Sequence, residues 1–178
     1  MSERGSVDVH RQLMTIELDG DLGIVFRRTF NGPARIVFDA WTKPELVQRW
    51  WAPAGLGVSM VSCEADVRVG GAYRYVIKAR GNPEMAFSGI YKELTPPTRL
   101  VHTQVFEPTA SGSNPDDGEL VVTVTFEEEA GRTRVTSRAV APTKEVRDAI
   151  VASGMESGAR MTWDQLDELV AELDGGRA

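Results

Sequence analysis

The C-terminal segment from Met155 to about Leu173 constrains the fold most, because it predicts one long helix with a single apolar side. Residues of that side recur at the three- and four-residue spacing of a helix face, and charged residues fill the positions between them. The face consists of Met155, Ala159, Thr162, Trp163, Leu166, Leu169, Val170 and Leu173. Gly175 and Gly176 follow, as glycine often does at a helix end. Such a helix needs one large apolar surface, and we expect the preceding residues to build it.

Length and cysteine content place the chain in a broad class. Its 178 residues suit one domain, which at this size buries roughly 70% of its unfolded surface and needs no disulfide or metal. The single cysteine, Cys63, has no internal partner, which fits a reducing compartment. Residues 1–11 are polar rather than a signal peptide, and no run approaches the roughly 20 apolar residues of a membrane span. We therefore expect a cytoplasmic protein with no membrane span.

The charge balance bears on partners. Lys and Arg number 20 against 26 Asp and Glu, a net charge of −6, which disfavours nucleic acid and anionic membrane surfaces. No basic stripe opposes this average. We expect the neighbouring Arg27 and Arg28, and the acidic run Glu127-Glu128-Glu129, to lie on solvated faces.

The N-terminal third predicts a hairpin and two short helices. Residues 1–21 are expected to form a leader, with an extra edge strand as an open alternative, because Asp19-Gly20-Asp21 between apolar runs is typical of a hairpin turn. The first full strand runs from Leu22 to Phe30. A helix starting at Pro33 follows, and Thr42-Lys43-Pro44-Glu45 has the form of a capping box for a second one.

From Val58 onward the apolar period changes to two, which indicates strands at short spacing. A loop at Pro108 to Gly118 interrupts them, a short helix follows Thr143, and Ser153-Gly154 separates it from the long helix. Consecutive strands with short turns form an antiparallel meander. We therefore predict an α+β fold: a curved antiparallel sheet of six to seven strands wrapped around the C-terminal helix, with 22–174 as the single domain and 175–178 as a tail.

Four separated stretches, in order, resemble one known family. They are RTFNGPARIVFDAWTKPELVQRWWAP (28–53), DVRVGGAYRYVI (66–77), FSGIYKELTPPTRLVHT (87–103) and SGMESGARMTWDQLDEL (153–169). Together they are similar to the SRPBCC superfamily, also called START-like or helix-grip, and more narrowly to homologues of the C-terminal domain of the activator of the ninety-kilodalton heat-shock chaperone ATPase. The resemblance implies the helix-grip fold. It implies no single activity, since the superfamily includes lipid carriers, hormone receptors, cyclases and dehydratases, and the co-chaperone domain.

A long helix across a curled sheet cannot contact all of it, so a cavity is expected between sheet, helix and the two short helices. We predict that this cavity binds a small, largely apolar molecule without a cofactor. Aromatic and methionine side chains offer adaptable apolar walls, and tyrosine or histidine can orient a polar group. The candidate ligand-binding residues are Trp51, Tyr73, Tyr75, Phe87, His102, Phe106, Met155 and Trp163.

Catalysis is an alternative that the residues leave open. His102 could act as a general base beside Gln104 or Tyr75 in a polyketide cyclase or dehydratase-like enzyme. Packing is the commoner role of a lone strand histidine, so we place binding ahead of catalysis and assign no catalytic residue. No cluster of Cys and His suggests zinc, and Gly70-Gly71 precedes a strand rather than the helix of a phosphate loop. We expect no metal.

A second alternative is a protein-interaction module. The resemblance to the chaperone ATPase activator implies a possible chaperone partner, which would use an exposed apolar or charged patch outside the cavity. That activator has a separate N-terminal domain for much of its chaperone contact, and we expect no counterpart here. A homodimer formed through sheet edges is also possible.

Overall fold

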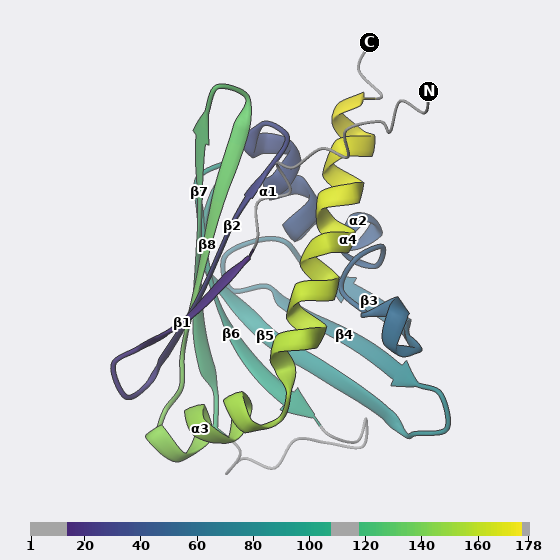
Figure 1. The fold of residues 1–178 in the computed structure, drawn as a ribbon, viewed down its shortest axis with the longest axis vertical. Coiled ribbons are helices and arrows are strands. Elements are labelled where there is room, and N and C mark those ends of the chain that lie inside the picture. Colours follow the sequence, from purple (N-terminus) through teal and green to yellow (C-terminus); the bar gives the residue numbers. More distant parts are fainter. Residues whose placement is uncertain (1–13, 108–117, 176–178) are drawn as a thin grey trace, which may run out of the picture.

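The computed structural model describes residues 14–107 and 118–175, which form one sheet with a long helix across one of its faces (Figure 1). This is the predicted α+β helix-grip fold, and that prediction is confirmed. Residues 1–13 of the predicted leader, residues 108–117 of the predicted loop and residues 176–178 of the tail lie outside the described residues.

All neighbouring strands of the sheet are antiparallel, in the order β1-β2-β8-β7-β6-β5-β4-β3. The strands are β1 (Thr15–Asp19), β2 (Gly23–Phe30), β3 (Val58–Ala65), β4 (Ala72–Ala79), β5 (Glu84–Thr95), β6 (Arg99–Glu107), β7 (Leu120–Glu129) and β8 (Arg132–Val140). From β3 to β8 each strand pairs with the next in sequence, as a meander requires. The described chain has eight strands rather than six or seven, because β1 pairs with β2 along its whole length.

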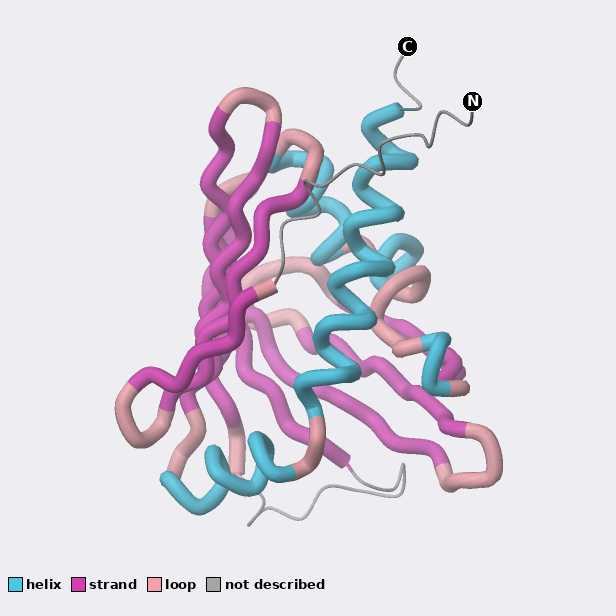
Figure 2. Tube along the Cα trace, in the orientation of Figure 1, coloured by secondary structure: helices cyan, strands magenta, loops and turns pink. Residues whose placement is uncertain are grey.

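Two short helices follow β2, as predicted, and two further helices end the chain (Figure 2). The α-helices are α1 (Ala34–Thr42), α2 (Pro44–Val47), α3 (Lys144–Ala152) and α4 (Met155–Gly175), with the 3-10 turn η1 (Ala54–Leu56) before β3. Gly154, with φ of 78°, separates α3 from α4. Since only glycine adopts this left-handed conformation at little cost, the predicted break falls where the backbone requires it.

The start of α2 corrects one expectation, and the start of α1 shows a contact that the sequence did not predict. The predicted capping box does not form, because the Thr42 hydroxyl donates to the Phe38 carbonyl (2.9 Å) and Lys43 occupies the N-cap of α2 without a side-chain bond. Glu128 is exposed, as predicted, and its Oε1 also accepts a hydrogen bond from the Ala34 backbone N–H at 2.7 Å. A carboxylate at a helix N-terminus satisfies a free N–H and the helix dipole, so β7 fixes where α1 begins.

The core lies between the concave face of the sheet, α1 and the C-terminal half of α4. Its fully buried side chains include Phe30, Val37, Trp50, Leu100 and Leu166. The Trp50 indole N–H donates to the Ala40 carbonyl at 2.8 Å, which satisfies the one polar atom that this large ring brings inside.

Arg28 is buried, contrary to the prediction of a solvated face. Only 5% of the residue is exposed, and its guanidinium bonds Asp164 (2.6 Å) and Asp167 (3.1 Å) of α4. The guanidinium carbon also lies 5.5 Å from the centre of the Phe30 ring. Arg28 shares the concave face with Phe30, so an ion-paired cation joins β2 to the long helix within the apolar layer.

None of the helices in the described part of the chain combines the length and apolar character needed to cross a membrane.

Candidate functional site

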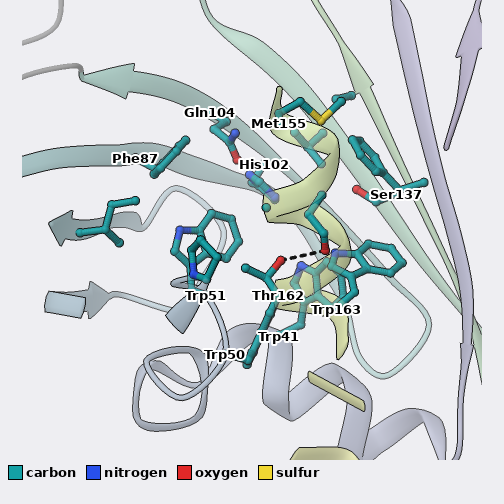
Figure 3. A pocket seen from close by; sticks show the side chains of 17 residues that line it. Trp41, Trp50, Trp51, Phe87, His102, Gln104, Ser137, Met155, Thr162 and Trp163 are labelled. Carbon is teal, nitrogen blue, oxygen red and sulfur yellow. Dashed lines mark hydrogen bonds between the residues drawn. The ribbon is translucent and has the colours of Figure 1, made fainter. Parts of the chain in front are cut away.

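A cavity of about 330 Å³ lies between α4, the segment after α2 and the concave face of the sheet (Figure 3). The sheet contributes Phe26, Ile77, Phe87, His102, Gln104, Val122, Ser137 and Ala139. The helix contributes Met155, Gly158, Ala159, Thr162 and Trp163, and the short helices and the segment after them contribute Trp41, Trp50, Trp51 and Pro53. Its size and mostly apolar lining are those of a small-molecule site.

Small residues on α4 create the space. Gly158, Ala159 and Thr162 face the cavity where large side chains would otherwise meet the sheet. A Cβ added at Gly158 would meet no atom within 4 Å. The side chains of α4 therefore leave the space between helix and sheet unfilled along this stretch.

Aromatic rings form the inner wall. The Trp41 ring packs edge-to-face on Trp163 at 5.4 Å between centroids and lies 5.0 Å from Trp50. Trp51 packs edge-on against Phe87 at 5.9 Å. Such tilted and edge-to-face pairs are the favoured geometries of aromatic rings, so this wall is preformed.

Gln165 holds the segment that carries Trp51. Its Nε2 donates to the carbonyls of Trp50 (3.1 Å) and Ala52 (2.8 Å), and its Oε1 accepts from the Ala54 N–H (3.0 Å). One side-chain amide of α4 thereby satisfies three backbone groups that no helix or strand would satisfy. The position of Trp51 follows from α4, which is far away in sequence.

His102 carries the best-defined polar atom of the cavity. The Tyr73 hydroxyl donates to the Thr103 carbonyl at 2.6 Å, and His102 Nδ1 lies 2.9 Å from that oxygen and 3.1 Å from the Tyr73 hydroxyl. Since the tyrosine proton is already donated and a carbonyl only accepts, Nδ1 must carry a proton to fit both neighbours. In a neutral imidazole the lone pair is then on Nε2.

Nε2 of His102 bonds no described residue. Nε2 is not among the fully enclosed side-chain atoms without a partner in the described chain. Because the ring lines the cavity and Tyr73 and Thr103 occupy Nδ1, we infer that the Nε2 lone pair opens on the cavity. Burial lowers the pKa of His102, and the bond to the Thr103 carbonyl opposes this in part. The imidazole is therefore neutral at pH 7.

Three tyrosines pack behind His102 in a separate niche. Tyr73, Tyr75 and Tyr91 surround a void of only about 10 Å³, room for no more than a single water molecule. Burial is the main cause that raises the pKa of each phenol, so all three are neutral. Gly89 allows Tyr73 and Thr103 to approach each other, because a Cβ there would lie 1.9 Å from the Thr103 carbonyl oxygen and 2.8 Å from Cε1 of Tyr73.

The structure separates the eight predicted ligand-binding residues into three groups. The cavity lining includes Trp51, Phe87, His102, Met155 and Trp163. Tyr73 and Tyr75 lie in the niche, and Trp51 and His102 border both spaces. Phe106 is 41% exposed and packs on Phe87 at 5.1 Å, outside the lining.

Several lining residues were not among the predicted ones. Ser137 and Ala139 alternate on β8 and Val122 lies on β7, and nothing in their own sequence marks them as different from ordinary core positions. Gly158 could have been recognised as a lining residue from the sequence. A glycine inside a long helix costs about 1 kcal/mol relative to alanine, so its presence there indicates a structural or functional role.

Metal binding and catalysis by a cysteine thiolate find little support among residues 14–107 and 118–175. No group of three or more His, Cys, Asp and Glu in that part could hold a metal ion. Burial, with a smaller effect of the Glu45 charge, raises the pKa of the Cys63 thiol to about 11. The thiolate, which is the nucleophilic form, is therefore scarce at neutral pH.

Comparison with known protein families agrees with the fold described above. Residues 31–171 match the family described as Activator of Hsp90 ATPase homolog 1-like protein, a span that contains most of the cavity lining. The chain belongs to this family. The resemblance seen in the sequence is thus confirmed, whereas a search of curated proteins finds no match.

Solved structures from several bacteria share the fold of this family member. A Rhodobacter sphaeroides protein is 26% identical with a TM-score of 0.79, over 89% of this chain and 99% of that one. A Staphylococcus epidermidis protein is 30% identical with a TM-score of 0.72, over 90% and 95%. CalU16 from Micromonospora echinospora, 20% identical with a TM-score of 0.58 over 90% and 85%, resembles the chain in fold alone.

Proposed function

We propose that this protein binds a small, largely apolar molecule in the cavity between α4 and the sheet. The observation that carries the proposal is the cavity itself: about 330 Å³, walled by aromatic rings and left open by Gly158, Ala159 and Thr162. A site of this shape gains affinity from burial of apolar surface, while a few polar groups set the orientation.

The ligand is neutral or nearly so. No Asp, Glu, Lys or Arg of the described residues lines the cavity, and Arg28 is already bound to Asp164 and Asp167. A carboxylate or ammonium would lose its hydration here without gaining an opposite charge, which is strongly unfavourable.

A cavity-filling variant tests this function without weakening the fold. Gly158→Leu places a branched side chain into open space on a helix, where leucine is also the better helix former. Native mass spectrometry of the purified protein, followed by thermal-shift screening of lipids and aromatic metabolites, should reveal a bound class in the wild type. We expect Gly158→Leu to lose that binding at unchanged or higher thermal stability.

Gly175→Leu is the matched control, because the same substitution at the exposed end of the same helix meets no neighbouring atom. It should bind as the wild type does. Binding that survives in Gly158→Leu, or a wild type that no compound stabilises, would refute the proposal.

Catalysis in the same cavity is a second candidate, favoured by the unpaired Nε2 of His102. A neutral imidazole held by Thr103 and Tyr73 has the protonation state of a general base. This candidate predicts that His102→Asn keeps binding of a polyketide-like substrate and loses its turnover. Absence of turnover in the wild type with any bound compound would remove it.

A third candidate is a protein-interaction module, favoured by exposed apolar side chains on β3 and the turn after it. Val61, Val67 and Val69 are 48%, 39% and 59% exposed, and β3 is an edge strand of the sheet. This candidate predicts that the heat-shock chaperone is recovered with the purified protein and lost with Val61→Lys. Equal recovery of the chaperone with both proteins would argue against this surface.

A further inference from the structure

Nε2 of His102 is a hydrogen-bond acceptor without a donor in the described chain, and binding of an apolar molecule does not explain it. His102 is 8% exposed, and its Nε2 lone pair bonds no described residue. Buried polar atoms are usually satisfied, and because Nε2 is not fully enclosed, its donor must come from a molecule in the cavity. Nδ1 is held by the Thr103 carbonyl and the Tyr73 hydroxyl, so the ring cannot turn its proton toward the cavity without losing both contacts.

We propose that the ligand is a neutral ring compound bearing a hydroxyl group, and that this hydroxyl donates its hydrogen bond to Nε2 of His102. The inference rests on the proposed function and adds the chemical class of the ligand. His102 thereby becomes the residue that determines specificity in a cavity whose other walls are mostly apolar.

The neighbours of His102 support a hydroxyl over other donors. Gln104 follows it by two positions on the same face of β6 and also lines the cavity, and its amide bonds no described residue (Figure 3). A hydroxyl is donor and acceptor at once, so it can donate to Nε2 and accept from the Gln104 amide. An ammonium would find no carboxylate among the lining residues, and a carboxylate would meet the Nε2 lone pair.

The walls support a ring. Trp51, Phe87 and Trp163 face the cavity from three elements, and Trp51 meets Phe87 edge-on. Aromatic side chains pack well against the faces and edges of another ring system. A flexible chain would also lose more conformational entropy on binding than a rigid ring does.

Two probes of nearly equal size isolate the hydroxyl. 2-Naphthol carries the donor and is neutral at pH 7.5, while 2-fluoronaphthalene fills the same space without a donor. Affinities for wild type, His102→Asn and His102→Gln are measured by titration of tryptophan fluorescence. The asparagine amide can keep the contact to Thr103 but removes the acceptor at the Nε2 position, whereas glutamine restores an acceptor there.

We expect His102→Asn to weaken 2-naphthol about tenfold, which corresponds to about 1.4 kcal/mol, and to leave 2-fluoronaphthalene within about twofold. His102→Gln should recover part of the loss. In ¹⁵N-labelled wild type, 2-naphthol should shift the Nε2 resonance of His102 and 2-fluoronaphthalene should not. The resonance needs no variant, so the test holds even if a substitution impairs folding.

The outcomes distinguish this inference from the proposed function. If both probes bind the wild type, fail to bind Gly158→Leu, and lose affinity equally or not at all in His102→Asn, the cavity is the site and the hydroxyl inference is wrong. If neither probe binds the wild type, the inference of a hydroxyl-bearing ring is wrong, and the compound screen decides the proposed function. If both probes bind Gly158→Leu normally, the cavity is not their site and the proposed function fails as well.

Discussion

The two halves of α4 lie on the same sheet face but serve different purposes. In the C-terminal half, Leu166, Leu169 and Val170 are at most 3% exposed and pack into the core. In the N-terminal half, Gly158, Ala159 and Thr162 line a cavity. One amphipathic helix can therefore both stabilise the fold and leave room for a ligand, and smaller side chains mark the part that borders the cavity.

The halves differ in electrostatics as well. Asp164, near the middle of the helix, and Asp167, in the packed half, bind Arg28 of β2. The cavity half presents no charged lining residue in the described chain. The charges that fix the helix therefore lie outside the lining of the proposed binding site. Within the lining they would disfavour an apolar ligand.

The largest expected effect is that of truncating the packed half. Leu166→Ala should lower the free energy of unfolding by about 2–5 kcal/mol, because a fully buried leucine leaves a void that its neighbours cannot close. Urea denaturation measures this. Met155→Ala, at the cavity end of the same helix, should cost no more than about 1 kcal/mol, since it already borders empty space. Equal losses would erase the distinction between the halves.

Removing the buried cation should have the next largest effect. Arg28→Met keeps most of the volume but takes the guanidinium from Asp164 and Asp167, and should cost about 1–3 kcal/mol. The two carboxylates are partly exposed, at 43% and 27%, which reduces the loss. Arg27→Met is the control: its pair with Glu17 is exposed, so it should cost less than about 1 kcal/mol in the same denaturation experiment.

A small gain is expected in the cavity half. Gly158→Ala adds one methyl group toward open space and should stabilise the protein by up to about 1 kcal/mol in thermal unfolding. Gly154→Ala should do the opposite, because φ of 78° is unfavourable for alanine. A loss in Gly158→Ala would mean that the space next to this residue is needed for folding.

The smallest effect is a pH dependence. The pKa of His102 is lowered in the folded protein, so below about pH 6.5 the unfolded chain binds its proton more readily. Stability contributed by neutral His102 is present above that pH and is lost as pH falls. The groups around the ring are the neutral Tyr73 and Tyr91, the Thr103 carbonyl and the cavity-facing Gln104.

Urea unfolding of wild type and His102→Asn at pH 7.5 and pH 5.0 measures this contribution, since carboxylates elsewhere titrate alike in both proteins. Wild type should lose more stability between the two values than the variant. An equal loss would show that His102 takes up its proton in the folded protein as readily as in the unfolded chain.

Much of the fold could be predicted because its signals are local. The period of two after Val58 marked the strands, Asp19-Gly20-Asp21 marked the hairpin turn, and Ser153-Gly154 marked the helix break. The errors arose where a distant partner overrides a local pattern. Arg28 lies in the same alternation as Phe26 and Phe30 but was expected to be solvated because it is charged. Only its ion pairs with Asp164 and Asp167 explain how it is buried.

The candidate site was less predictable for the same reason. Trp51 and His102 were chosen by residue type and do border the cavity, but Phe106, on the same face of β6, lies beyond it. Alternation along a strand tells which face a side chain occupies. It does not tell how far the covering helix reaches along that face.

The sequence by itself determined the element order, the antiparallel meander, the long amphipathic helix and the family, because hydrophobic period and turn chemistry act over a few residues. The tertiary structure alone decided where α4 stops filling the sheet, which nitrogen of His102 faces the cavity, and that Arg28 is buried. Each of these depends on contacts between residues far apart in the chain, such as Tyr73 with Thr103 and Arg28 with Asp164. No local pattern encodes such contacts.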